Sequence, residues 1–213
     1  TIDDTRQQLL YQTLVLLLLT AVIGLTIKYR LVRRTRGIVM LSSVVYLGFV
    51  SGGCPCMIMS LQDTVLFALG GSASMVAMLW FIGLIPVTYF FGKAWCGWLC
   101  HLGGLQDFLF RVSGKKVLTS INAQKTVKWV QVSLFVVLIV QLVITRTNIW
   151  VRYDPFKAAF NLIAGNNITY ALLAILLVSC VFIYRPFCRM ACPVGLVLGW
   201  VTNIPGARKL QLA

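Results

Sequence analysis

The sequence predicts an all-α membrane protein, a polytopic bundle of about five transmembrane helices with cysteine-bearing turns. Apolar residues make up 59% of the 213 residues and charged residues only 11%. Soluble domains carry about 25% charged residues, so a water-soluble globular fold is excluded. Apolar runs recur along the chain, and we expect residues 1–213 to form a single integral membrane domain.

Five apolar runs are candidate membrane spans. Crossing a bilayer takes about 20 residues, so the second and fifth runs would borrow flanking residues. The first run lacks a basic start and a small-residue cleavage site, so we expect a retained span and not a signal peptide. The five runs are Leu9–Ile27, Gly37–Gly53, Ser74–Phe91, Val127–Thr145 and Tyr170–Tyr184.

The basic residues predict which side of the membrane each loop faces. Cytoplasmic loops are enriched in Lys and Arg. With the N-terminus outside, fifteen basic residues lie in inner loops and only four lie outside: Arg6, Arg146, Arg152 and Lys157. We therefore expect a protein of the inner (cytoplasmic) membrane with a cytoplasmic C-terminus. Its net charge of +14 then reflects loops that face anionic lipid, and no nucleic-acid partner is expected.

Six of the seven cysteines form close pairs after predicted spans. Leu-Gln-Asp follows the first two pairs at the same distance, at 61–63 and 105–107, and an apolar version, 197–199, follows the third. Each repeat is expected to be a span, a cysteine-bearing turn and a short apolar segment that lies on or re-enters the membrane. The pairs are Cys54 and Cys56, Cys96 and Cys100, and Cys188 and Cys192.

Two of these pairs are expected to converge at the inner face, because each follows a span that runs from outside to inside. Four thiolates are the usual ligands of an iron-sulfur cluster, and also of structural zinc. Basic neighbours would offset the thiolate charge, and aromatic neighbours would screen a cluster from water, which favours iron-sulfur over zinc. The predicted ligands of one [4Fe-4S] cluster are Cys96, Cys100, Cys188 and Cys192; the basic neighbours are Lys93, Arg185 and Arg189, and the aromatic ones Trp95, Trp98 and Phe187.

The remaining cysteines are interpreted differently. Cys54 and Cys56 would lie on the outer side, as a ligand pair, a redox-active dithiol or a structural pair. The Leu-Gln-Asp repeat favours ligands, and so a second redox site near the outer face. Cys180 stands alone in a span, where a small packed cysteine is common. Disulfides between the inner pairs are not expected, because the inner face meets a reducing compartment.

Other polar residues leave alternatives open. The segment from Cys96 to His101 resembles a widened haem c attachment site, but haem c is attached outside and this segment is expected inside. His101 would otherwise donate a hydrogen bond to a cluster sulfur or lie at the interface. Asp63 and Asp107 could relay protons, although we favour a role in holding the cysteine turns.

Whole classes of catalysis are excluded by composition. The chain contains no glutamate and one histidine. These facts exclude the HExxH proteases, EF-hands, paired-Glu glycosidases and bis-His haem. No nucleophile, base and orienting group stand together, so independent hydrolytic catalysis is not expected. The cysteine pairs lead us to expect instead an electron-transfer subunit of an oxidoreductase complex.

The two inner motifs resemble those of a known family. Lys93-Ala-Trp-Cys96-Gly-Trp-Leu-Cys100 with Gly-Gly-Leu-Gln, and Arg185-Pro-Phe-Cys188-Arg-Met-Ala-Cys192-Pro-Val-Gly, look like the paired CxxxCP motifs of membrane iron-sulfur proteins of the NapH and NosR type. Asp154-Pro155-Phe156 in the outer loop also matches. The resemblance marks the four inner cysteines as redox-site residues. It implies electron transfer between a quinol, or a periplasmic flavin domain, and reductase systems.

Two departures from that family change what is expected. His101 stands where the family has proline, and the family's soluble ferredoxin module, with its CxxCxxCxxxCP run, is not found up to Ala213. That module would be supplied by a ferredoxin-like partner or lie outside this sequence. Expected partners are membrane lipid, other redox subunits and a periplasmic flavin or haem protein. The alternative functions are a metal-handling or assembly factor for a membrane oxidase or reductase, with thiols that pass copper or iron, and a structural anchor.

Overall fold

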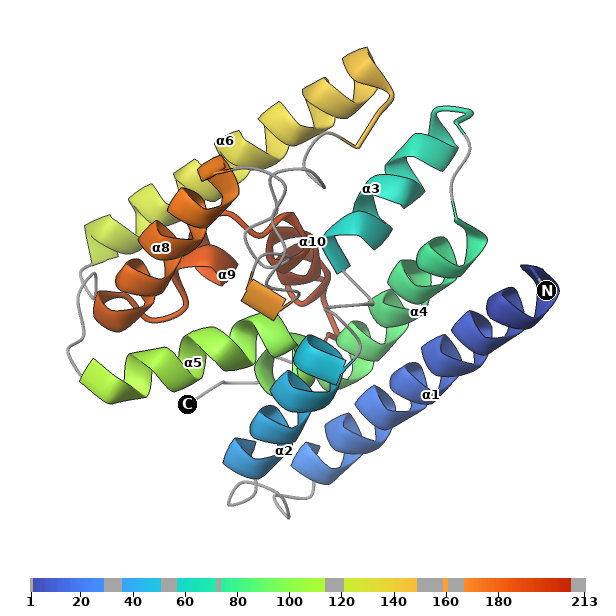
Figure 1. Cartoon of the computed structure of the whole chain (residues 1–213), viewed down its shortest axis with the longest axis horizontal. Coiled ribbons are helices and arrows are strands. Elements are labelled where there is room, and N and C mark those ends of the chain that lie inside the picture. The colour runs from blue at the N-terminus through green and yellow to red at the C-terminus, as the bar shows by residue number, and fades with distance from the viewer. Residues whose placement is uncertain are drawn as a thin grey trace.

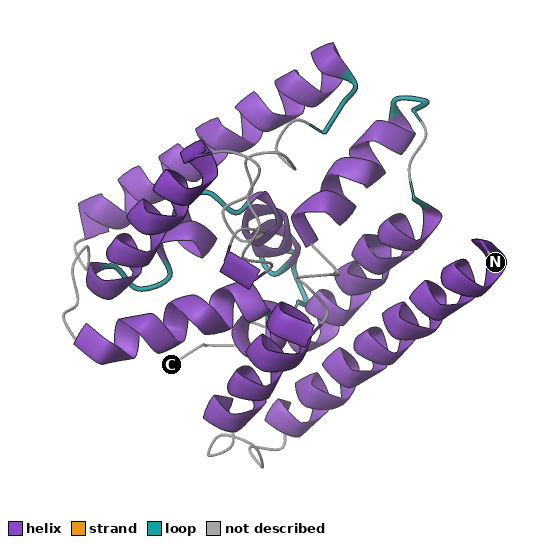
Figure 2. Ribbon diagram, viewed as in Figure 1, coloured by secondary structure: helices purple, strands orange, loops and turns teal. Residues whose placement is uncertain are grey.

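A computed structural model describes residues 2–28, 36–50, 57–71, 74–113, 121–148, 159–160 and 167–207. These residues are mostly helical, and no strand occurs among them (Figure 2). The predicted all-α class is therefore confirmed. Apolar side chains cannot accept hydrogen bonds. A helix therefore pairs the backbone N–H groups of each apolar run with carbonyls of the same run.

Each predicted span coincides with a helix in the structure. Helix α1 (Ile2–Lys28) and helix α6 (Ile121–Thr145) are the long ones. Both contain an apolar window long enough to cross a bilayer, and these are the two such helices in the described part of the chain. The other three candidates are shorter apolar helices: α2 with its π-helical continuation η1 (Arg36–Ser43 and Val44–Val50), α4 (Met75–Phe91) and α8 (Asn167–Phe182).

Short helices follow the cysteine pairs, as the repeat predicted. They are α3 (Met57–Ala68), α5 (His101–Ser113) and α10 (Pro193–Val201). A π-helical turn, η2 (Trp95–Leu99), and a short helix, α9 (Pro186–Met190), carry the first cysteines of the two inner pairs. Helix α10 lies near the middle of the molecule, with α3, α4, α5 and α6 around it (Figure 1).

The helices pack into one bundle around the cysteine turns. Helices α1 and α4 lie side by side and run in the same direction, and α3 packs on α4 in the opposite direction (Figure 1). On the other side α5 packs against α8, and α6 contacts α9 and α10. The largest core cluster contains Trp80, Leu84, Trp95, Trp98 and Leu198, so α4, η2 and α10 contribute side chains to one core.

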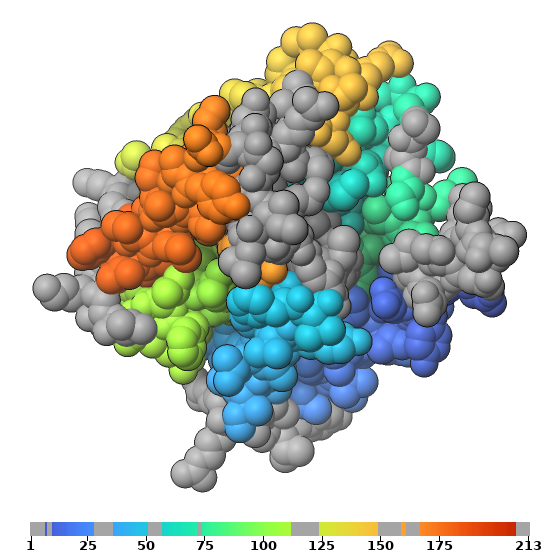
Figure 3. Space-filling model, viewed as in Figure 1, coloured from blue at the N-terminus to red at the C-terminus, as the bar shows by residue number. Residues whose placement is uncertain are grey.

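The outer surface of the bundle is strongly apolar. Large apolar side chains are exposed on α1, α6 and α8, including Tyr11, Trp129, Ile144 and Ile175. Figure 3 shows one face of the molecule, with α8, α5 and the helix formed by α2 and η1 on it. Soluble monomers rarely expose contiguous apolar patches of more than a few hundred Å².

Candidate metal centre

The structure brings the two inner cysteine pairs together at the centre of the bundle. Cys96 lies in η2 and Cys100 directly after it; Cys188 lies in α9, and Cys192 precedes α10. All four are free and partly buried. Cys96, Cys100 and Cys192 pack against the same core cluster. Cysteines about 90 positions apart in sequence therefore lie near one another; that they hold one cluster stays a prediction.

The four thiols influence one another electrostatically. Burial, and then the charge of Cys100, raises the pKa of Cys96 to about 12, while Lys93 and Arg185 lower it. Burial also raises the pKa of Cys188, and the charges of Cys100, Cys192 and Cys96 add to that rise. Such thiols stay protonated until a metal binds, and binding then displaces their protons.

The two cysteine turns share a pair of equivalent backbone hydrogen bonds. In the first turn the N–H of Gly97 donates to the carbonyl of Lys93 (3.0 Å), and that of Cys100 donates to the carbonyl of Trp95 (2.8 Å). The second turn repeats these bonds at positions 92 residues later, with lengths of 3.1 and 2.9 Å, from Arg189 to Arg185 and from Cys192 to Phe187. The second bond of each turn spans five residues, as in a π-bulge, a feature frequent at functional sites.

A basic residue from each turn braces the other turn. Arg185, three residues before Cys188, donates from Nη1 to the carbonyl of Cys96 (2.9 Å). Lys93, three residues before Cys96, donates from Nζ to the carbonyl of Gly195 (3.4 Å). The two motifs are therefore related by an approximate two-fold exchange, and each basic residue places a positive charge beside the thiols.

Glycines allow each short helix to approach its own cysteine turn closely. A Cβ at Gly103 would lie 3.1 Å from the carbonyl oxygen of Cys96, and a Cβ at Gly195 would lie 3.1 Å from that of Cys188. Both contacts are tighter than most real Cβ contacts. Glycine therefore stands three residues after the second cysteine of each pair because a larger side chain would crowd the carbonyl of the first cysteine.

Two glutamines add hydrogen bonds to the second turn. Gln106 donates from Nε2 to Cys188 Sγ (3.5 Å) and accepts the N–H of Phe187 (3.1 Å) on Oε1. Gln131 of α6 donates to the carbonyls of Cys192 (2.9 Å) and Cys188 (3.4 Å). Gln131 was not among the residues predicted from the sequence, although a glutamine within an apolar span usually needs a buried partner.

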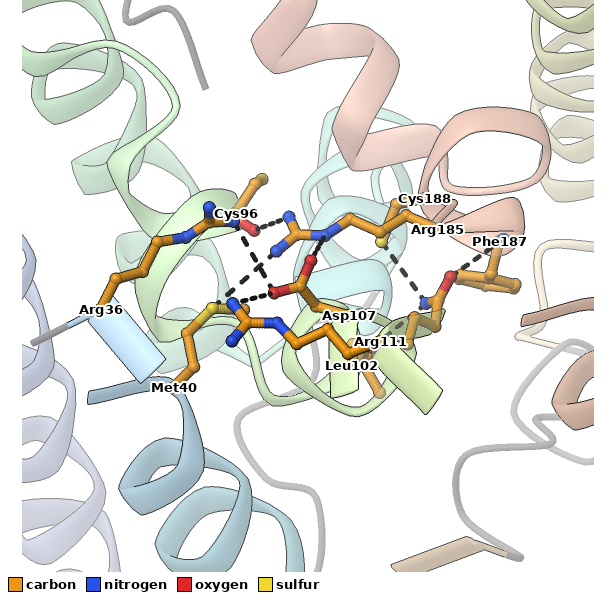
Figure 4. Close-up of polar contacts among 10 residues, drawn as sticks. Arg36, Met40, Cys96, Leu102, Asp107, Arg111, Arg185, Phe187 and Cys188 are labelled. Atoms are coloured by element: carbon orange, nitrogen blue, oxygen red, sulfur yellow. Dashed lines mark hydrogen bonds and ion pairs between the residues drawn. The ribbon is translucent and has the colours of Figure 1, made fainter. Parts of the chain in front are cut away.

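Asp107 holds the arginine that braces the first turn. Its carboxylate lies between three guanidinium groups, of Arg111 (3.3 Å), Arg185 (3.7 Å) and Arg36 (3.9 Å), as Figure 4 shows. Arg185 is only 5% exposed and has a left-handed backbone (φ 49°), so the strained residue is fixed by its partners. Asp107 therefore acts on the first turn indirectly: it pairs with Arg185, and Arg185 donates to the carbonyl of Cys96.

Asp63 and His101 lie in different surroundings. Asp63 accepts a hydrogen bond from Nδ2 of Asn148 (3.0 Å), three residues beyond the end of α6, and the turn of Cys54 and Cys56 lies outside the described residues. His101 is buried beside Phe160, with ring centroids 5.2 Å apart, and burial lowers its pKa to about 4. A neutral histidine is therefore expected directly after Cys100.

The other predicted residues are placed as follows. Cys180 is fully buried in α8, where packing accounts for it. Trp95 and Trp98 are buried in the core cluster that Cys96 and Cys100 contact, so they exclude water from that side. Cys54, Cys56 and Asp154-Pro155-Phe156 lie outside the described residues.

Four cysteines are the usual ligands of a [4Fe-4S] cluster, and also of structural zinc. Among the described side chains, no three of His, Cys, Asp or Glu are close enough together to hold a single metal ion.

Comparisons with known proteins agree with this donor set. A family model described as a 4Fe-4S binding domain matches residues 73–119 and 168–211, the two segments that contain the inner cysteine turns. The match identifies the chain as an iron-sulfur protein. Its cofactor is a [4Fe-4S] cluster, as the sequence predicted.

One relative extends the similarity beyond the cysteine turns. The chain is 27% identical over 161 residues to an uncharacterized protein of Methanocaldococcus jannaschii, a stretch that covers 72% of this chain. It spans 65% of that relative's length. No solved structure matches the chain.

Proposed function

We propose that the chain is a membrane electron-transfer subunit in which Cys96, Cys100, Cys188 and Cys192 hold one [4Fe-4S] cluster. The observation that carries the proposal is the pair of hydrogen bonds by which Arg185 and Lys93 each reach a carbonyl of the other motif. These bonds hold the two cysteine turns together, with both basic side chains near the thiols. Such a cluster supplies a one-electron redox centre; the protein sets its position, dielectric and hydrogen bonds.

The membrane location is part of the proposal. Only 22% of the apolar windows of α1 and α6 is buried, whereas the core helix of a soluble protein is mostly buried. The exposed apolar side chains on α8 point to the same conclusion. The three shorter helices would complete the five-span bundle, with the N-terminus outside, the C-terminus inside and the cluster towards the inner face. The turns are tolerated at that depth because protein encloses them.

The partners follow from the same reasoning. A single buried cluster needs a donor and an acceptor that approach it from elsewhere. A quinol or a periplasmic flavin or haem protein would serve on one side, and a ferredoxin-like subunit on the other. Membership of the NapH and NosR type, and a second redox site at Cys54 and Cys56, belong to this proposal.

The test is the iron and acid-labile sulfide content of anaerobically purified protein, with EPR spectra before and after dithionite. We expect about four irons and four sulfides per chain and a signal that appears on reduction. Cys188→Ser should lose both, while Cys180→Ser should keep them, because Cys180 is buried in α8 away from the site. Near eight irons would bring in Cys54 and Cys56.

Two outcomes would favour the alternatives. Protein that binds neither iron nor sulfide after reconstitution, but binds copper tightly, would be a metal-handling factor. If electron flow is unchanged after all four inner cysteines are replaced by serine, the chain would be a structural anchor of the complex.

A further inference from the structure

A polar cavity opens beside the second cysteine turn. It has a volume of about 340 Å³, and Cys188, Gly195 and Gly199 form part of its wall. Three basic side chains line it, those of Lys93, Lys128 and Arg189. No carboxylate is among its lining residues. Its size lies in the range of small-molecule sites.

A comparison of the two motifs shows that the basic residue beside this cavity has no carboxylate at the equivalent position. Arg185 and Lys93 occupy equivalent positions, three residues before the first cysteine of each pair. Arg185 has a carboxylate partner, Asp107, which lies seven residues after Cys100. The equivalent position, seven residues after Cys192, is Gly199.

Gly199 places no side chain beside the ammonium group of Lys93, which donates to the carbonyl of Gly195. A Cβ built there would lie 3.1 Å from Nζ of Lys93, so the ammonium group sits where the side chain would begin. Asp107, in contrast, forms ion pairs with Arg185, Arg111 and Arg36. Among the described residues that line the cavity, no carboxylate stands beside Lys93, Lys128 or Arg189.

We propose that this cavity binds an oxyanion group, a phosphate or a carboxylate, in the place that Asp107 takes in the first half of the site. Lys93, Lys128 and Arg189 would neutralise it, since charge-assisted hydrogen bonds of this kind are the strong ones. The group can come from a soluble molecule or from the headgroup of an anionic lipid. Because Cys188 lines the same cavity, a bound anion would also make the cluster of the proposed function harder to reduce.

Binding is tested first, by equilibrium dialysis of inorganic phosphate against the full chain in phosphatidylcholine nanodiscs. We expect saturable binding that is weakened about tenfold or more in Lys128→Gln and in Arg189→Gln. Gly199→Asp, which restores the carboxylate of the other half, should abolish it. Lys125→Gln is the matched control: it removes one charge from the same helix outside the cavity and should bind as the wild type does.

The source and the redox effect are tested next. In phosphatidylglycerol nanodiscs, loss of phosphate binding would identify a lipid headgroup as the occupant, and unchanged binding would identify a soluble anion. The cluster's midpoint potential should fall when either occupant binds, and not in Arg189→Gln.

Absence of saturable phosphate binding, together with equal midpoint potentials in the two lipids, would overturn the proposal. So would binding that Lys128→Gln and Arg189→Gln leave unchanged. Dialysis needs no cluster, so a chain without iron that still binds phosphate would refute the proposed function and leave this cavity site standing.

Discussion

Gln106 joins the two halves of the site through a single side chain. Its amide donates to Cys188 Sγ and accepts the N–H of Phe187. A hydrogen bond to a cluster sulfur stabilises the more negative, reduced state. Gln106→Leu, which copies Leu198 at the equivalent position, should therefore lower the cluster's midpoint potential in an EPR redox titration. The fall is about 40 mV if the bond favours the reduced cluster by about 1 kcal/mol.

A matched glutamine controls for the loss of an amide. Gln141 lies on α6 and bonds to Thr145 and to the carbonyl of Thr147. Gln141→Leu should leave the potential unchanged. Equal potentials in Gln106→Leu and the wild type would show that the contact with Cys188 does not tune the cluster.

His101 makes stability depend on pH. Its pKa is lowered to about 4 by burial, from 6.5. Between these values the unfolded state binds a proton that the folded state does not, so the free energy of unfolding falls as the pH drops below 6.5. The loss is about 2 kcal/mol at pH 5. His101→Phe keeps a ring against Phe160 but cannot titrate, and its melting temperature should fall less than that of the wild type between pH 7 and pH 5.

Individual residues show what a sequence can predict of a site. The cysteine pairs were evident because their spacing repeats, and the comparisons confirmed the type of cofactor. The hydrogen-bond partners of Gln131 and Lys93 could not be predicted from the sequence, because both side chains bind carbonyls of the distant second motif. Sequence spacing contains no information about which carbonyl a flexible side chain will reach.

At the scale of the elements, α1 and α4 pack closely through glycine. A Cβ at Gly24 of α1 would lie 2.6 Å from Cβ of Phe91 in α4. Gly24→Ala should therefore force the helices apart and cost about 1–3 kcal/mol. Gly37→Ala is the matched control, because Arg111 is its nearest neighbour at 3.9 Å and alanine favours a helix. Melting temperatures measured in detergent would compare the two; an unaffected Gly24→Ala would show that the contact is adaptable.

The elements were predictable where hydropathy alone decides them. Each expected span is a helix, and a short helix follows each cysteine pair. Hydropathy could not show the π-helical turns η1 and η2, since these depend on contacts with other elements. Ser43 of α2, for example, donates a hydrogen bond to the carbonyl of Leu99, at the end of η2. Five spans remain a prediction, because two helices meet the length and hydropathy required.

For the whole molecule, the distribution of charge predicts a topology that reporters can test. Alkaline phosphatase is active only outside the cytoplasm, and green fluorescent protein folds inside it. Fused after Ala213, the fluorescent reporter should be active and the phosphatase inactive, because fifteen of the basic residues are expected inside. A fusion within the predicted outer loop should show the reverse. An active phosphatase fused after Ala213 would contradict the predicted orientation.

The exchange of braces has a consequence for the order of events during synthesis. Cys96 leaves the ribosome about 90 residues before Cys188, and its carbonyl has no arginine partner until Arg185 has been made. Contacts so distant in sequence form late. The cofactor is therefore expected to enter only after α10 is in place. A chain shortened before Pro193 keeps about nine-tenths of the residues and all four cysteines, but it lacks α10 and the Gly195 carbonyl that Lys93 binds, and it should not retain iron.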